Sequence, residues 1–177
     1  MFMRSERLFL RPRWPEDRDE LLELAAGDWV AREVAGLDWL RETQGAQFGV
    51  NGGRFPHFVV TAPGIAGSSP VGGIGFDPHS RGAELAFWIV DGHRGQGFAT
   101  EAVRALLPLA AMLGHKRLVA APYADDAASM RVLAKAGFAA TGDSRVRFSK
   151  GLGVERVTAI HEIALDGSAS GGGLLAA

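Results

Sequence analysis

A glycine-rich turn near the middle of the chain has the composition of an anion-binding site. In DGHRGQGFATEAVRALL, residues 91–107, three glycines and an arginine precede an amphipathic run that predicts a helix. Successive backbone N–H groups at a helix N-terminus can converge on a phosphate, and glycine lets the backbone come close to it. The pattern therefore predicts that the backbone from Arg94 to Ala99 binds an anion.

Two common phosphate-binding motifs fit this turn poorly. A P-loop requires Lys followed by Ser or Thr after its last glycine, whereas Phe98, Ala99 and Thr100 follow Gly97. A dinucleotide fingerprint requires a small residue where Thr100 stands and an acid about 20 residues further on, and the next apolar run, KRLVAAPY, carries no acid. A nucleotide-binding domain remains a weaker alternative, in which NAD or ATP would bind at the turn.

One acidic residue interrupts an otherwise apolar segment just before the turn. The segment AELAFWIV, residues 83–90, predicts a strand covered on both faces, and Glu84 is its only charged residue. Alternation places Glu84 on one face with Ala86 and Trp88. A carboxylate in such surroundings either pairs with an arginine or has a raised pKa that suits it to proton transfer. Both alternatives stay open from the sequence.

The elements that must position these residues alternate along the chain. Capping residues and apolar periodicity predict helices at 15–27, 100–114 and 125–137. Alternating or apolar runs predict strands at 6–11, 56–63, 68–78, 83–90, 116–123, 138–148 and 154–165, with 56–78 forming a hairpin. We expect an α/β fold with a mixed, mostly antiparallel central sheet flanked by helices. Residues 28–55 have no clear periodicity.

Length and composition favour a single domain. The chain has 177 residues, of which 47% are hydrophobic, which suits one core at residues 1–166 followed by a low-complexity tail at 167–177. The net charge of -1 gives no basic excess, so we expect no nucleic-acid partner. The five histidines lack metal-ligand spacing, and the chain has no cysteine, which excludes an acyl-cysteine intermediate. We expect no metal site, no membrane segment and a cytoplasmic location.

Several segments together resemble the GCN5-related N-acetyltransferases (GNAT), in particular the ribosomal-protein N-terminal acetyltransferase type of RimJ and RimL. The segments ERLFLRP, PVGGIGF, ELAFWIVDGHRGQGFATEAVRAL and DDAASMRVLAKAGF occur in the order that this family uses, within residues 5–165. The turn matches its Arg/Gln-x-x-Gly-x-Gly/Ala motif at Arg94 to Ala99. The resemblance implies an acetyltransferase that uses acetyl-CoA as cosubstrate and acetylates a primary amine, either a protein N-terminus or a small amine. A homodimer is a possible assembly.

The resemblance assigns roles to individual residues. It implies that the pyrophosphate of coenzyme A binds the turn and that the pantetheine arm lies along the preceding strand. Independently of the resemblance, the chemistry of the transfer requires a base and a stabilised oxyanion: Glu84, the only acid of its strand, is the candidate general base, and a backbone N–H around Ile89 or Val90 would contact the developing oxyanion. Ser129 matches the serine of the family's Asn-x-x-Ser pattern and would assist the departing thiolate. The coenzyme-binding set would be Ile89, Val90, Arg94, Gly95, Gln96, Gly97, Phe98, Ala99, Thr100 and Asp126.

The sequence departs from the family pattern beside Ser129. Asp126 stands where the family has asparagine, and it also suits the N-cap of the helix that follows. Leu133 stands where many of these enzymes have a tyrosine. A non-catalytic acyl-CoA-binding or regulatory module therefore remains an alternative to the enzyme.

Overall fold

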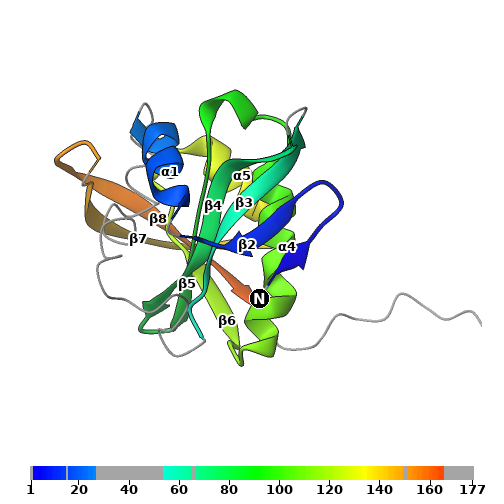
Figure 1. The fold of residues 1–177 in the computed structure, drawn as a ribbon. Coiled ribbons are helices and arrows are strands. Elements are labelled where there is room, and N and C mark those ends of the chain that lie inside the picture. Colours follow the sequence, from blue (N-terminus) through cyan, green and yellow to red (C-terminus); the bar gives the residue numbers. More distant parts are fainter. Residues whose placement is uncertain (1, 15, 27–53, 65–66, 150, 166–177) are drawn as a thin grey trace, which may run out of the picture.

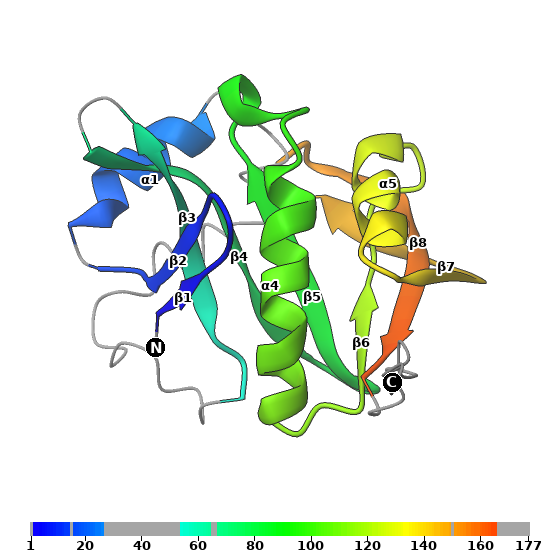
Figure 2. The same ribbon diagram turned by 90° about the vertical axis from the view of Figure 1, so that its right-hand side faces the viewer.

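A computed structural model describes residues 2–14, 16–26, 54–64, 67–149 and 151–165, which form one mixed sheet with helices on it. The eight strands lie in the order β1-β2-β3-β4-β5-β6-β8-β7. Among these strands, β5 (Gly82–Ile89) and β6 (Arg117–Ala120) run parallel, and the other neighbours run antiparallel. Helices α4 (Phe98–Met112) and α5 (Ala127–Lys135) lie on one face, and α1 (Asp17–Ala26) lies on the opposite side from α4 (Figures 1 and 2). The predicted fold class is confirmed.

The hairpin predicted over residues 56–78 is present, and the last two predicted strands form a second hairpin. Strands β3 (His57–Gly64) and β4 (Gly67–His79) form the first, and β7 (Ala139–Ser149) and β8 (Val154–Ala164) form the second. In β4, Gly72 and Gly73 lie so close to β5 that a Cβ at Gly72 would come within 2.1 Å of the Trp88 carbonyl oxygen. Glycine is therefore required where these two strands approach most closely.

The strand predicted over residues 6–11 is wrong in its extent. The structure has β1 (Met3–Arg4) and β2 (Phe9–Pro12), which pair with each other, and residues 5–8 form the turn between them. The Ser5 N–H donates to the Leu8 carbonyl oxygen at 3.0 Å and closes this turn. The polar–apolar alternation of the sequence extends into this turn because Leu8, although it is not part of a strand, is buried in the core with 2% exposure. The sequence pattern therefore does not mark the break.

Helix α4 is the element that joins the core to the glycine turn. Its apolar stripe of Ala102, Val103, Leu106 and Ala110 is buried against the sheet, and the helix gives way to a left-handed glycine, Gly114, as expected. Burial of four such side chains fixes the helix axis. The N-terminus of α4 is therefore held at a constant position beside the end of β5.

A buried ion pair anchors α1. Both carboxylate oxygens of Asp17 accept from the Arg11 guanidinium, at 2.6 and 2.7 Å, and Asp17 also accepts from the Trp14 N–H. Burial opposes ionisation, but these hydrogen bonds and the nearby charges outweigh it and lower the pKa of Asp17. The predicted helix start at Pro15 and end at Gly27 lie outside the described residues, as do residues 28–53 and the C-terminal tail. None of the described helices is long and apolar enough to cross a membrane.

Candidate active site

Strands β5 and β6 separate from each other beside the glycine turn. They pair at Ala83 with Leu118 and at Glu84 with Val119, whereas β5 continues to Ile89 (Figure 2). The Val90 N–H donates to the Val71 carbonyl oxygen of β4 at 2.9 Å. Successive N–H groups of a strand point to opposite edges, so the Ile89 N–H points away from β4 and into the gap between β5 and β6. Beyond Glu84, the edge of β5 that faces β6 therefore has no strand partner among the described residues.

The turn after β5 holds two glycines in the left-handed conformation. The φ angles are 76° at Gly95 and 82° at Gly97, and Gly97 is the N-cap of α4 without a side-chain cap. Arg94 fixes the start of the turn, because its Nε donates to the Ile89 carbonyl oxygen at 2.9 Å and its Nη1 lies 2.6 Å from Asp91 Oδ1. The uncapped N–H groups at the positive end of α4 can therefore face an anion.

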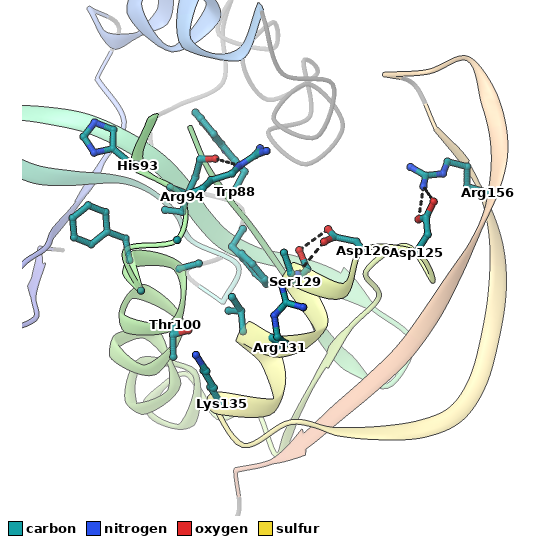
Figure 3. A pocket seen from close by; sticks show the side chains of 18 residues that line it. Trp88, His93, Arg94, Thr100, Asp125, Asp126, Ser129, Arg131, Lys135 and Arg156 are labelled. Carbon is teal, nitrogen blue, oxygen red and sulfur yellow. Dashed lines mark hydrogen bonds and ion pairs between the residues drawn. The ribbon is translucent and has the colours of Figure 1, made fainter. Parts of the chain in front are cut away.

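The start of α5 places a hydroxyl group opposite β5. Asp126 caps α5 by accepting from the Ser129 N–H at 3.0 Å, which confirms the predicted cap. Its second oxygen accepts from the Ser129 hydroxyl at 2.7 Å. The two side chains form a carboxylate–hydroxyl pair, drawn with dashed lines in Figure 3.

These three features border one cavity of about 560 Å³ (Figure 3). Its walls come from the end of β5, the glycine turn, the start of α4, the exposed side of α5 and one residue of β8. The lining residues that the sequence predicted are Ile89, Arg94, Gly95, Gly97, Phe98, Ala99, Thr100, Asp126 and Ser129. Nine of the predicted residues from three separate elements thus border a single space.

Three predicted residues do not line this cavity. The Val90 N–H donates to the Val71 carbonyl oxygen of β4, so of the two N–H groups predicted for the oxyanion contact only that of Ile89 faces the gap, and the contact itself stays a prediction. Gln96 does not belong to the lining, and its side-chain Nε2 donates to the Gly92 carbonyl oxygen at 3.3 Å. Glu84 lies outside the lining, at the position where β5 still pairs with β6.

Glu84 is held by two arginines of β7. The Arg145 guanidinium donates to Glu84 Oε2 at 2.6 Å, and the Arg147 guanidinium donates to Glu84 Oε1. The Glu84 side chain is 13% exposed, whereas the Arg145 and Arg147 side chains are 33% and 40% exposed, so the carboxylate is mostly buried and its partners reach the solvent. Of the two alternatives that the sequence left open for this carboxylate, the structure contains the arginine pair. The role of Glu84 as a general base stays a prediction.

Several lining residues were missed from the sequence. They are Phe87, Trp88, His93, Asp125, Ala128, Arg131, Val132, Lys135 and Arg156. Those of α5 follow a helical spacing, since Ala128, Arg131 and Lys135 fall on one face together with Ser129, and this spacing was a usable signal. Arg156 had no local signal, because it comes from β8 and reaches the cavity beside Asp125, with which it forms an ion pair.

The sequence matches a known protein family, and the structure resembles several solved structures. Residues 7–139 match a family model described as an acetyltransferase (GNAT) domain. The structure resembles an acetyltransferase from Salmonella typhimurium that modifies the N-terminal serine of ribosomal protein L7/L12, with 17% identity, coverage of 94% of this chain and 100% of that chain, and a TM-score of 0.72. It also resembles Mycobacterium smegmatis RimJ in complex with CoA-disulfide, with 21% identity, coverage of 93% and 86%, and a TM-score of 0.72.

A third similar structure is the microcin C7 self-immunity acetyltransferase MccE in complex with acetyl-CoA and AMP, with 14% identity, coverage of 90% of this chain and 93% of that chain, and a TM-score of 0.70. At these identities the structural similarities show the fold alone. No curated protein sequence matches the chain significantly. The family match spans most of the chain and includes β5, the glycine turn, α4 and α5. The chain therefore belongs to the GNAT family of acetyl-CoA-dependent acyltransferases.

Proposed function

We propose that the protein transfers the acetyl group of acetyl-CoA to a primary amine by direct attack within a ternary complex. The observation that carries the proposal is the joining of the β5–β6 gap, the uncapped N-terminus of α4 and Ser129 in one cavity. Such a cavity combines an anion site with an edge of β5 that has no strand partner among the described residues. A long cosubstrate with a pyrophosphate and an amide-bearing arm requires both.

The residues of the turn fit the pyrophosphate. Gly95 and Gly97 have no Cβ to occupy the space above the backbone N–H groups, and their positive φ angles favour glycine at both positions. Two further cations of α5, Arg131 and Lys135, line the same cavity and can approach negatively charged phosphates (Figure 3). The pantetheine arm contains amide groups, which the free edge of β5 next to Phe87 and Ile89 can hydrogen-bond.

Ser129 and Ile89 are the groups placed to assist the chemistry. Bound acetyl-CoA supplies the thioester: the amine nitrogen forms a bond to its carbonyl carbon and loses a proton, and the carbon–sulfur bond breaks to release the coenzyme A thiolate. The Ile89 N–H, directed into the gap, can stabilise negative charge on the carbonyl oxygen. The Ser129 hydroxyl can donate to the departing thiolate after turning away from Asp126, which then acts as the helix cap alone.

We infer that the acceptor is the α-amine of a protein N-terminus, and such an acceptor on a ribosomal protein would place the reaction in the cytoplasm. Support comes from the similarity to RimJ and to the acetyltransferase that modifies ribosomal protein L7/L12. The test compares three acceptors at equal concentration: a peptide with a free N-terminus, the same sequence N-terminally blocked with a free lysine, and spermidine. The α-amine should react fastest. Faster acetylation of spermidine or of the lysine side chain would contradict a protein N-terminus as the acceptor and would identify that amine class as the acceptor instead.

We predict that the acetyl group passes directly from acetyl-CoA to the amine, without a covalent acetyl-enzyme intermediate. The chain has no cysteine, so the usual thiol nucleophile for a covalent intermediate is absent from the whole sequence. Initial rates measured at several fixed amine concentrations against acetyl-CoA should therefore give intersecting reciprocal plots. Parallel plots, or an enzyme mass increased by one acetyl group that amine then removes, would contradict direct attack.

The Glu84→Gln substitution tests the predicted base. If Glu84 accepts the proton of the incoming ammonium, directly or through water, turnover should fall by about 10²-fold, most strongly at low pH where free amine is scarce. Coenzyme A affinity should stay nearly unchanged because Glu84 lies outside the cavity lining. Arg145→Gln is the matched control, since it weakens the same ion pair but keeps the carboxylate. Equal, pH-independent losses in both variants would assign Glu84 a structural role only.

A further inference from the structure

The turn between β1 and β2 is attached to the first turn of α4 through a single carboxylate. Glu101 Oε1 accepts from the Ser5 hydroxyl at 2.6 Å and from the Arg7 N–H at 2.7 Å. Glu101 Oε2 accepts from Arg7 Nε at 2.8 Å and lies 2.8 Å from Arg7 Nη2. The Glu101 side chain is only 15% exposed. Ser5 and Arg7, which lie more than 90 residues before Glu101 in the chain, thus direct four hydrogen-bond donors at its carboxylate.

Arg7 extends these contacts to the glycine turn itself. Its Nη1 donates to the Gln96 carbonyl oxygen at 3.0 Å, and its guanidinium carbon lies 4.8 Å from the centre of the Phe98 ring. Its Nη2 would lie 3.4 Å from a Cβ placed on Gly97. Arg7 therefore contacts Gln96 and Phe98, on either side of Gly97, as well as Glu101.

The turn needs such an external support for a conformational reason. Its two left-handed glycines allow many backbone conformations, and the N-cap glycine contributes no side-chain hydrogen bond. Arg7 binds a carbonyl oxygen of the turn and leaves the N–H groups at the start of α4 available to an anion. A turn that is held in the binding conformation before the ligand arrives loses less conformational entropy when the ligand binds.

The pair also has an electrostatic consequence. Glu101 lies in the first turn of α4, where an unpaired carboxylate would repel a second anion at the same helix end. Burial opposes ionisation of Glu101, but the hydrogen bonds from Ser5 and Arg7 and the charge of Arg7 lower its pKa below the ordinary value of 4.5, so it is ionised at neutral pH. Arg7 balances that charge directly beside the turn.

We propose that Arg7 is a positioning residue for the acyl donor: with Glu101 it fixes the glycine turn in its anion-binding conformation and neutralises the carboxylate beside it. The proposal rests on the assignment of the turn to the pyrophosphate. It predicts that Arg7 acts on donor binding and leaves the chemical step unchanged. It also predicts that the effects of Arg7 and Glu101 are coupled, because loss of the arginine is harmful chiefly while the acid remains.

The experiment measures coenzyme A affinity by calorimetry for the wild type, Arg7→Met, Glu101→Gln and the double variant. Arg7→Met should weaken binding on the order of tenfold, and Glu101→Gln should weaken it less because it also removes the repulsive charge. The double variant should bind more tightly than Arg7→Met alone. In turnover assays, Arg7→Met should raise the KM for acetyl-CoA and leave kcat at saturation unchanged. Arg4→Met, at an exposed position of β1, is the control.

Two results would overturn the proposal. Wild-type affinity in Arg7→Met would show that the contacts are structural only, and additive losses in the double variant would remove the coupling. Should Arg7→Met fold poorly, Arg7→Lys keeps the charge but cannot reach Glu101 and Gln96 together, so it should give an intermediate affinity. If the wild-type protein does not bind coenzyme A, the assignment of the turn to the pyrophosphate fails. If the wild type and the Arg7 variant bind coenzyme A equally well, only the role proposed for Arg7 fails.

Discussion

Gly97→Glu is expected to abolish coenzyme A binding. The new side chain would begin at a left-handed φ of 82°, where its Cβ would lie 3.4 Å from Arg7 Nη2, and it would add a negative charge at the N-terminus of α4, where the pyrophosphate is proposed to bind. In the wild type, coenzyme A at about 100 times its Kd should stabilise the protein by about 2.7 kcal/mol and raise the Tm. The variant should show no ligand-dependent change in Tm and no heat of binding.

Gly142→Glu is the matched control for this substitution. Gly142 also has a left-handed φ, 85°, but it lies in β7, away from the cavity, and a Cβ there would meet no neighbour within 4 Å among the described residues. The control variant should carry a similar backbone strain and retain coenzyme A affinity. Unchanged affinity in Gly97→Glu, with the control behaving normally, would remove the pyrophosphate from the turn.

Ser129→Ala is expected to lower kcat by about 10²-fold while the KM for acetyl-CoA changes little. The substitution removes the hydroxyl group that faces the cavity but keeps the backbone N–H that Asp126 caps at 3.0 Å, so α5 should remain folded. Steady-state rates at saturating substrates measure the effect, and circular dichroism verifies the fold. Ser68→Ala, at an exposed position of β4, is the control. Wild-type kcat in Ser129→Ala would assign the hydroxyl a structural role.

The parts of the fold that depend on local sequence could be predicted. The β3–β4 hairpin, the α4 stripe and the Asp126 cap each follow from residues close together in the chain, and each is present. The strand predicted over residues 6–11 failed for the opposite reason. Its break at residues 5–8 is stabilised by Glu101, whose partnership with Ser5 and Arg7 no local pattern encodes.

The candidate site divides in the same way. The glycine turn and Ser129 lie at helix starts, where turn chemistry and capping residues are visible in the sequence. The environment of Glu84 was not predictable, because its two arginines lie 61 and 63 residues further along the chain on a different hairpin. The use of the Val90 N–H by Val71 was hidden for a similar reason, since it depends on the pairing of β5 with β4.

The central claim is that the cavity supports acetyl transfer to an amine, as opposed to binding of an acyl-CoA without turnover. The most direct measurement incubates the protein with acetyl-CoA carrying an isotope-labelled acetyl group and a peptide with a free N-terminus, and follows free thiol and peptide mass together. We predict one thiol released per labelled acetyl group found on the peptide α-amine, with no label on the enzyme and no reaction in Gly97→Glu. Tight coenzyme A binding without amine-dependent thiol release, across a library of peptides and small amines, would contradict the claim and identify a non-catalytic binding module.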